Sequence, residues 1–251
     1  YRTLLDDKSV DVFMVATPDH WHALPTIHGC LAGKDVYVEK PASHNVREGR
    51  VAVEAARKHD RIVQHGTQSR SSNGWARAVA AVKSGQYGAL KVSRAIVYKR
   101  RDSIGFESTK APPAELDFNI WLGPAPEQPY HENLVHYDWH WFWDFGNGDI
   151  GNQGVHQMDI ARWGIPGATW PKSDVSLGGR FGYEDQGETP NTQLTVFDYG
   201  DTQLIFEVRG LVPKNHIDNV FHFASELPAL TRTPRRWPGV NCQYPSCDPS
   251  S

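Results

Sequence analysis

The sequence has few cysteines and no long hydrophobic run. Its three cysteines are too scattered to form a disulfide framework. Cys242 and Cys247 lack C-x-x-C spacing and a second pair of ligands, so they do not indicate a zinc site. No stretch approaches the length of apolar sequence that spans a bilayer. The net charge is -3 over 251 residues, which favours neither nucleic acid nor an anionic membrane as a partner.

Features that would fix the compartment are also lacking. The chain has no signal-peptide pattern and no initiator methionine, and it opens within an apparent helix at Tyr1-Arg2-Thr3-Leu4-Leu5. We therefore expect that the native N-terminus is missing. No targeting signal, cytoplasmic or periplasmic, can then be read from this sequence.

What the sequence does contain is an alternation of apolar strands and amphipathic helices in its first 88 residues. The patterns predict strands near 10–17, 36–40 and 62–66 and helices near 21–32, 46–59 and 73–84. The first strand is almost continuously apolar, which is typical of a sheet buried on both faces. This alternation predicts right-handed crossovers and a parallel sheet.

The pattern changes near residue 88, which we take as a domain boundary. Beyond it the sequence predicts a strand near 90–98, a helix at 152–163, and strands near 173–182, 191–199 and 202–209. The hairpin spacing around Tyr199-Gly200-Asp201 suggests an antiparallel sheet. We predict an α/β chain with domains at 1–88 and 89–212, followed by an irregular tail at 213–251.

One stretch stands out chemically, Val36-Tyr37-Val38-Glu39-Lys40-Pro41. Alternating β-branched residues indicate a buried strand, and Pro41 ends it. Lys40 therefore lies at the carboxyl end of a parallel strand, where ligands bind in open α/β sheets. An ammonium beside a carboxylate there can hold a substrate hydroxyl. An exposed Lys-Glu pair that starts a loop fits the same residues equally well.

Three motifs in this order resemble the glucose–fructose oxidoreductase / inositol 2-dehydrogenase (Gfo/Idh/MocA) family of NAD(P)-dependent enzymes. They are Ala16-Thr17-Pro18-x-x-x-His22, the stretch Ala32 to Pro41, and Gly154-x-His156-x-x-Asp159. Trp121-Leu122-Gly123-Pro124 looks like a large environmental branch of that family. The resemblance covers about residues 1–212. It implies a partial Rossmann-type first domain and a second α+β domain whose open, mainly antiparallel sheet covers the substrate and often mediates oligomerisation.

The resemblance also implies residue roles and a cofactor, NAD or NADP. Lys40, His156 and Asn152 are the expected catalytic residues, with Lys40 holding the hydroxyl, His156 as base and Asn152 orienting the imidazole. The expected cofactor-binding residues are Thr17, Pro18, His22, Glu39, Lys40, Pro41 and Gln68. The expected substrate-binding residues are Lys40, Arg70, Asp159 and His156.

Two departures from the family pattern affect these expectations. The Gly-rich phosphate loop and the acidic ribose ligand precede the first strand seen here, so we expect residues 1–251 alone to bind NAD(P) weakly or not at all. Most dehydrogenase members have Asp where this chain has Asn152. An amide cannot stabilise imidazolium by charge, so a weaker base or another reaction is compatible.

Other patterns are weaker. Gly146-Asn147-Gly148-Asp149-Ile150-Gly151 matches G-x-G-x-x-G but follows no apolar strand, so we interpret it as a turn feeding a helix. His136, His140 and the aromatic residues around them are interpreted as core or interface. His156 is alternatively a hydrogen-bonded core residue. His20, His22, His156 and Asp159 could hold a metal, but they lack paired spacing, so we expect no metal.

The resemblance implies an NAD(P)-dependent oxidoreductase that acts on a hydroxyl of a sugar or cyclitol. One alternative keeps the fold and cofactor but uses transient oxidation to cleave a glycosidic bond. Another is a non-catalytic binding or oligomerisation module. We expect a small carbohydrate or cyclitol substrate, no nucleic-acid or membrane partner, and a homo-oligomer formed through the second-domain sheet.

Overall fold

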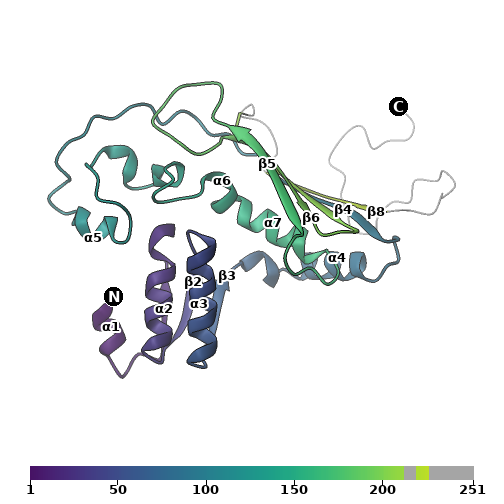
Figure 1. Cartoon of the computed structure of the whole chain (residues 1–251), viewed down its shortest axis with the longest axis horizontal. Coiled ribbons are helices and arrows are strands. Elements are labelled where there is room, and N and C mark those ends of the chain that lie inside the picture. Colours follow the sequence, from purple (N-terminus) through teal and green to yellow (C-terminus); the bar gives the residue numbers. More distant parts are fainter. Residues whose placement is uncertain (212–218, 226–251) are drawn as a thin grey trace.

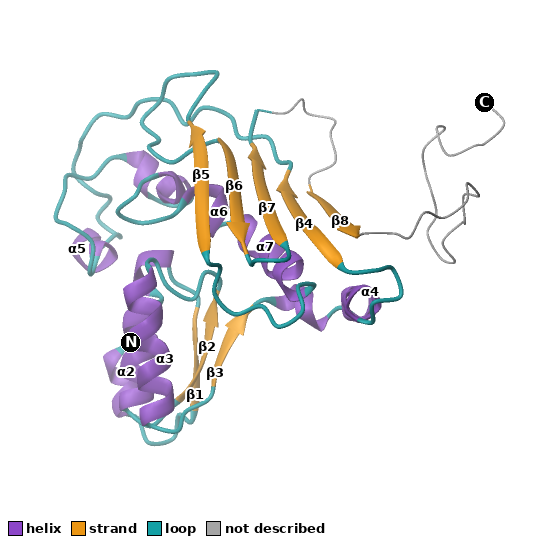
Figure 2. Cartoon of the chain, turned by 45° about the vertical axis from the view of Figure 1, so that its right-hand side comes forward, coloured by secondary structure: helices purple, strands orange, loops and turns teal. Residues whose placement is uncertain are grey.

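The computed structural model describes residues 1–211 and 219–225 of the chain. A smaller domain, whose sheet has three strands, lies beneath a larger domain with a broad sheet, and helix α7 (Gly154–Trp163) lies between that sheet and the smaller domain (Figures 1 and 2). No helix in the described residues is long and apolar enough to cross a membrane.

The first domain is a parallel sheet of strands β1 (Val12–Val15), β2 (Asp35–Glu39) and β3 (Val63–Gly66), in that order. It follows helix α1 (Arg2–Asp6). Helices α2 (Ala23–Leu31) and α3 (Val46–Lys58) pack on one face of the sheet (Figure 2). A Cβ atom at Gly29 would meet the Phe13 ring at 2.4 Å, so a glycine is needed for this close approach of helix and sheet. The Rossmann-type parallel sheet that the sequence predicted is confirmed.

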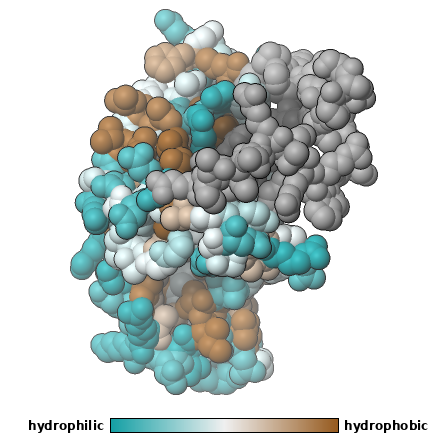
Figure 3. Space-filling view, turned by 90° about the vertical axis from the view of Figure 1, so that its right-hand side faces the viewer, coloured by the Kyte–Doolittle hydropathy of each residue, from teal (hydrophilic) through white to brown (hydrophobic). Residues whose placement is uncertain are grey.

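Strand β1 is shorter and less buried than the sequence indicated. Val12 and Met14 are 58% and 64% exposed, so the expectation of burial on both faces is wrong. The reason is that β1 forms the edge of the sheet and both helices cover the opposite face. In Figure 3, hydrophobic side chains gather on the surface in the lower part of the view, where the first domain lies.

Helix α3 has a well-defined start that can be tested. The Asn45 side chain accepts a hydrogen bond from the Glu48 amide at 3.0 Å, and Glu48 Oε2 accepts one from the His44 amide at 3.1 Å. We predict that Asn45→Ala lowers the free energy of unfolding by about 1 kcal/mol, because a helix N-terminal donor loses its partner. Urea unfolding measures this. Arg50→Ala, on an exposed part of the same helix, is the control, and an equal loss in both variants would contradict the capping role.

The second domain is built on a five-stranded sheet. Its strands are β4 (Leu90–Val97), β5 (Ser173–Gly179), β6 (Thr192–Asp198), β7 (Gln203–Arg209) and β8 (Asn219–Ser225), in the order β5-β6-β7-β4-β8. Only the β4–β7 pair is parallel among these described strands. The predicted open, mainly antiparallel sheet is therefore confirmed.

One face of this sheet packs against α7 and makes the largest core of the domain. Its buried residues come from β4, β7, α7 and the turn after α7, and they include Ala95, Phe206 and Ala161. Ser93 on β4 donates its hydroxyl proton to the Ala161 carbonyl at 2.8 Å, which ties the helix to the sheet. Helix α4 (Asn73–Lys83) joins the two domains and contributes Val82 to the same core. This packing fixes where α7 presents its residues to the first domain.

Strand β8 corrects the prediction of an irregular tail at 213–251. Residues 219–225 pair antiparallel with β4 at the edge of the sheet. The run Val220-Phe221-His222-Phe223 has the β-branched and aromatic composition of a strand, but its partner lies more than a hundred residues earlier. Residues 212–218 and 226–251, with Cys242 and Cys247, lie outside the described residues.

The long connection between β4 and α7 folds into an aromatic cluster. It contains helices α5 (Phe118–Leu122) and α6 (Gly148–Gly151) and the 3-10 turns η3 (Glu132–Leu134) and η4 (Asp138–Trp141). The buried residues of this cluster are Leu122, Leu134, Trp139, Phe142 and Phe145. Most of the aromatic run is thus core, as predicted, but Tyr137 and Trp143 are about half exposed.

This connection also contacts the first domain. The carbonyl of Trp121 accepts a hydrogen bond from Trp21 Nε1 at 3.0 Å and lies 2.9 Å from His20 Nε2. Both residues belong to the 3-10 turn η1 (Asp19–Trp21) that follows β1. A Cβ atom at Gly123 would lie 2.1 Å from the Trp21 ring, so the Trp121-Leu122-Gly123-Pro124 turn can dock here only with glycine.

Candidate active site

The candidate site lies where the carboxyl ends of β1, β2 and β3 face α6 and α7. Strand β2 ends at Glu39, and Lys40 follows it directly. Lys40 Nζ donates a hydrogen bond of 3.0 Å to Asn152 Oδ1. This contact joins the two domains and brings together two of the three residues predicted to be catalytic. Lys40 is therefore not simply an exposed charge at the start of a loop.

Asn152 reaches Lys40 in a different way from the one the sequence indicated. Helix α7 begins at Gly154, and Asn152, with φ -82° and ψ -94°, lies in the break between α6 and α7. The predicted helix at 152–163 would place Asn152 and His156 on one helical face, and this is wrong, because Gly151 and Asn152 favour a helix end over a helix interior. Within the described residues, Asn152 bonds Lys40 and Tyr137, and the buried Nδ1 of His156 has no partner.

His156 nevertheless has the electrostatic surroundings of a base. Burial lowers the pKa of its imidazole, the positive charge of Lys40 lowers that pKa further, and the carboxylates of Glu39 and Asp159 oppose the change. A pKa below its usual value leaves the ring neutral at neutral pH. His156 is therefore in the protonation state that can accept a proton.

Arg70 and Asp159, both predicted to bind substrate, contact each other. The Arg70 guanidinium donates two hydrogen bonds of 2.7 Å to the two carboxylate oxygens of Asp159. The guanidinium also lies 4.9 Å from the centre of the Trp163 ring. Since Arg70 follows β3 and Asp159 lies on α7, this pair clamps the first domain to the second. Any substrate contact by Asp159 has to compete with this bidentate pair.

His22 has a structural place in the site. Its Nδ1 lies 2.6 Å from the Pro41 carbonyl and its Nε2 lies 2.7 Å from the Thr17 carbonyl. The residue is only 1% exposed, and burial lowers the pKa of its imidazole although both carbonyls act in the opposite direction. His22 therefore braces the ends of β1 and β2 against each other.

The remaining residues predicted to bind the cofactor lie along the edge of the parallel sheet that is formed by the carboxyl ends of its strands. Thr17 and Gln68 are exposed beyond the carboxyl ends of β1 and β3, and Pro18 and Pro41 are partly exposed. Glu39 Oε2 accepts a hydrogen bond of 3.3 Å from the Lys40 amide. A Cβ atom at Gly66 would come within 2.8 Å of that carboxylate, so the glycine at the end of β3 leaves room for Glu39.

Two buried ionisable groups lie near Lys40, namely Asp19, which sequence reasoning missed, and His140, which was interpreted as core or interface. Burial raises the pKa of Asp19 to about 7 against the opposing effect of Lys40, and its Oδ2 has no partner within the described residues. Burial lowers the pKa of His140 to about 4, despite the opposing hydrogen bond from its Nδ1 to the Tyr137 carbonyl. No sequence signal marks either group, because burial decides both shifts.

The structure also explains two weaker sequence patterns, the G-x-G-x-x-G match and the set of possible metal ligands. The segment 146–151 forms a turn and helix α6 outside the parallel sheet, as interpreted, and Asp149 is fully buried in an ion pair with Arg101. Among the described residues, no three His, Cys, Asp or Glu side chains are arranged to hold a metal ion. His20 and His22 instead contact the backbone carbonyls described above.

Comparisons with known proteins agree with this architecture. Residues 1–67 match the family described as "Oxidoreductase family, NAD-binding Rossmann fold", and residues 97–166 match "Oxidoreductase family, C-terminal alpha/beta domain". Together the two matches cover more than half of the chain. They fall on either side of the predicted domain boundary.

Relatives in Bacillus subtilis (strain 168) have similar sequences. The chain is 30% identical over 114 residues to scyllo-inositol 2-dehydrogenase (NAD(+)), covering 45% of this chain and 30% of that protein. It is 31% identical over 88 residues to the uncharacterized oxidoreductase YrbE, covering 35% and 26%. These matches therefore span less than a third of either relative.

Solved structures show the same fold at low identity. The WlbA dehydrogenase from Bordetella pertussis in complex with NADH and UDP-GlcNAcA aligns with a TM-score of 0.67 and 18% identity, covering 90% of this chain and 56% of that one. Levoglucosan dehydrogenase in complex with NADH and levoglucosan aligns with a TM-score of 0.67 and 17% identity, covering 89% and 54%. The chain spans about half the length of these structures. Two matched domains in the family's order, on the family's fold, show that the chain belongs to the Gfo/Idh/MocA oxidoreductase family.

Proposed function

We propose that this protein is an NAD-dependent dehydrogenase that oxidises a hydroxyl group of a sugar or cyclitol. The observation that carries the proposal is the hydrogen bond from Lys40 Nζ to Asn152 Oδ1, which holds an ammonium at the end of β2 beside the neutral His156. The matched NAD-binding family domain supports the cofactor. The relatives that act on an inositol or were solved with a sugar ligand support the substrate class.

The residues present fit the nicotinamide end of such a cofactor. Thr17 and Gln68 flank the end of β2 from the neighbouring strands, and Pro18, Glu39 and Pro41 complete the edge. This edge offers the hydroxyl, amide and carboxylate groups that hold a ribose and a carboxamide. When bound there, NAD supplies the hydride acceptor.

The protein's own residues would handle the proton. Lys40 donates a hydrogen bond to the substrate hydroxyl and stabilises the negative charge that develops on its oxygen. His156 takes the hydroxyl proton at Nε2. Its other ring nitrogen, Nδ1, is buried without a partner, so the substrate does not reach that atom. Asn152 holds the Lys40 ammonium in place. Because the Asn152 amide is neutral, it does not cancel the positive charge of the Lys40 ammonium.

A substrate panel tests this proposal in the full-length protein. NADH formation is followed by absorbance with inositols, simple sugars and glycosides, and products are identified by mass spectrometry. Net NADH with a ketone product supports the dehydrogenase. Cleavage of a glycoside without net NADH would instead support the alternative that oxidises its substrate only transiently. Absence of both NADH and cleavage would favour a non-catalytic module.

We also propose that the exposed face of the second-domain sheet binds a second copy of the chain. Val175, Leu177 and Leu194 on β5 and β6 are exposed on the face opposite α7. We predict that Leu177→Lys shifts the protein from dimer or higher oligomer to monomer, because a charge replaces a buried apolar contact. Light scattering after gel filtration measures this. Val53→Lys, at an exposed apolar position of α3, is the control, and an unaltered mass in Leu177→Lys would exclude this face.

A further inference from the structure

Tyr137 lies beside the Lys40–Asn152 pair and was not among the residues predicted to be functional. Its hydroxyl oxygen lies 3.4 Å from Asn152 Nδ2 and 3.4 Å from Arg101 Nη1. The side chain is 51% exposed, in contrast to its buried neighbours Trp139 and Trp141. A ligand at Lys40 can therefore reach the same tyrosine.

The direction of each hydrogen bond follows from what each group can do. The Lys40 ammonium can only donate, so the Asn152 oxygen faces Lys40 and the Asn152 amino group faces Tyr137. The Arg101 guanidinium can also only donate. The Tyr137 oxygen therefore accepts from two donors. Its own proton has no acceptor among the residues that the structure describes.

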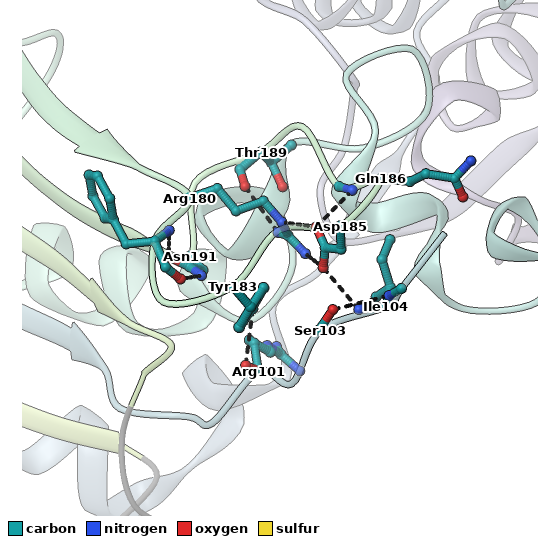
Figure 4. A network of polar contacts seen from close by, with 12 residues as sticks. Arg101, Ser103, Ile104, Arg180, Tyr183, Asp185, Gln186, Thr189 and Asn191 are labelled. Atoms are coloured by element: carbon teal, nitrogen blue, oxygen red, sulfur yellow. Dashed lines mark hydrogen bonds and ion pairs between the residues drawn. The ribbon is translucent and has the colours of Figure 1, made fainter. Parts of the chain in front are cut away.

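The position of Tyr137 is supported by a rigid arginine. The Arg101 guanidinium donates Nε–H and Nη2–H to the two oxygens of Asp149, at 2.9 and 2.5 Å, and lies 4.8 Å from the centre of the Trp141 ring. Its backbone carbonyl accepts a hydrogen bond of 3.1 Å from the Tyr183 hydroxyl (Figure 4). The Tyr183 segment is itself held by the bidentate Arg180–Asp185 ion pair drawn in the same view.

We propose that Tyr137 contacts the substrate and donates its phenolic proton to the hydroxyl next to the one held by Lys40. Lys40 and Tyr137 each lie one hydrogen bond away from the same Asn152 amide, so the two side chains are neighbours with protons left to donate. Two neighbouring donors fit two neighbouring oxygens. The substrate class is then a vicinal diol. This inference rests on the proposed function and adds a specificity-determining residue to it.

The role proposed for Tyr137 depends on residue 152 being an asparagine. A carboxylate at this position would accept from both Lys40 and the Tyr137 hydroxyl. The phenolic proton would then be directed toward residue 152 and away from the substrate. The amide of Asn152 keeps that proton free. Asn152→Asp should therefore reproduce the loss of recognition seen on removal of the Tyr137 hydroxyl, without any change to Tyr137 itself.

The test compares a diol with its deoxy analogues in the full-length protein. The probes are the best polyol found in the substrate panel and analogues that each lack one hydroxyl next to the oxidised carbon. For the unaltered protein, we expect kcat/KM to fall about tenfold when the hydroxyl facing Tyr137 is missing, the value of one hydrogen bond. In Tyr137→Phe and in Asn152→Asp, we expect that ratio to approach one.

Tyr183→Phe is the matched control, because it removes a hydroxyl that supports Arg101 without touching Asn152. We expect it to keep the tenfold ratio. A ratio that survives in Tyr137→Phe, or that is lost equally in Tyr183→Phe, would overturn the role of Tyr137 while leaving the dehydrogenase intact. If the unaltered protein oxidises no polyol at all, the proposed function fails and this inference fails with it.

Discussion

Lys40→Met in the full-length protein should lower kcat for polyol oxidation by at least about a hundredfold. This corresponds to about 2.7 kcal/mol of lost transition-state stabilisation. Methionine keeps most of the length of the side chain but removes the ammonium that donates to Asn152 Oδ1 at 3.0 Å. Without it, the oxygen of the reacting hydroxyl loses its donor at the moment when negative charge develops there. Steady-state kinetics with the best polyol measures the loss.

NAD affinity, measured by calorimetry, should change little in the same variant. The other residues at the ends of the three strands stay in place, and His22 still braces Thr17 against Pro41. Lys58→Met, an exposed lysine at the end of α3, is the matched control and should retain full activity. Turnover that is unchanged in Lys40→Met would remove Lys40 from the mechanism, whereas a parallel loss of NAD affinity would indicate that the lysine holds the cofactor.

Local sequence patterns predicted the Lys40 strand well. β-branched residues at Val36 and Val38 and the proline after Lys40 act within a few residues of each other, and both valines are buried as expected. The same holds for the β6–β7 hairpin, where Gly200 takes a positive φ of 90° in the turn. Such features depend on residues that are close together in the chain, so they can be predicted from a single sequence.

Contacts between distant segments were not predictable in the same way. Tyr137 lies in an aromatic run without helix or strand periodicity, so nothing in the sequence separates it from the buried Trp139 and Trp141. Its exposure and its contact with Asn152 depend on how the long connection between β4 and α7 docks. Strand β8 was missed for the same reason, because its partner β4 is remote in sequence.

The break before α7 shows how a correct motif was combined with a wrong geometry. The family motif placed His156 and Asp159 on one helix, and both lie on α7. Asn152 was added to that helix by spacing alone, although Gly151 and Asn152 both disfavour a helix interior. The break turns the Asn152 amide toward Lys40 and Tyr137. The residue thus connects the lysine to the phenol instead of orienting the imidazole.

The pH dependence of the reaction should report His156. Burial and the charge of Lys40 lower its pKa from the usual value of 6.5, and the neutral ring is the base in the proposed mechanism. In the unaltered protein, kcat/KM should therefore rise with pH through an apparent pKa below 6.5 and be level near pH 7. His156→Ala should remove this rise and lower kcat at pH 7 by about a hundredfold or more. His28→Ala, in α2, is the control and should keep the rise.

The direction of the pKa shift can be tested separately by NMR titration of His156. Removing the positive charge in Lys40→Met should raise its pKa, since a nearby cation disfavours imidazolium. Adding a negative charge in Asn152→Asp should raise the same pKa, because an anion favours imidazolium. The acid limb of kcat/KM should then move to higher pH in Asn152→Asp. If neither variant moves the His156 titration, the imidazole does not sense the Lys40–Asn152 pair, and it cannot be the base for a hydroxyl held there.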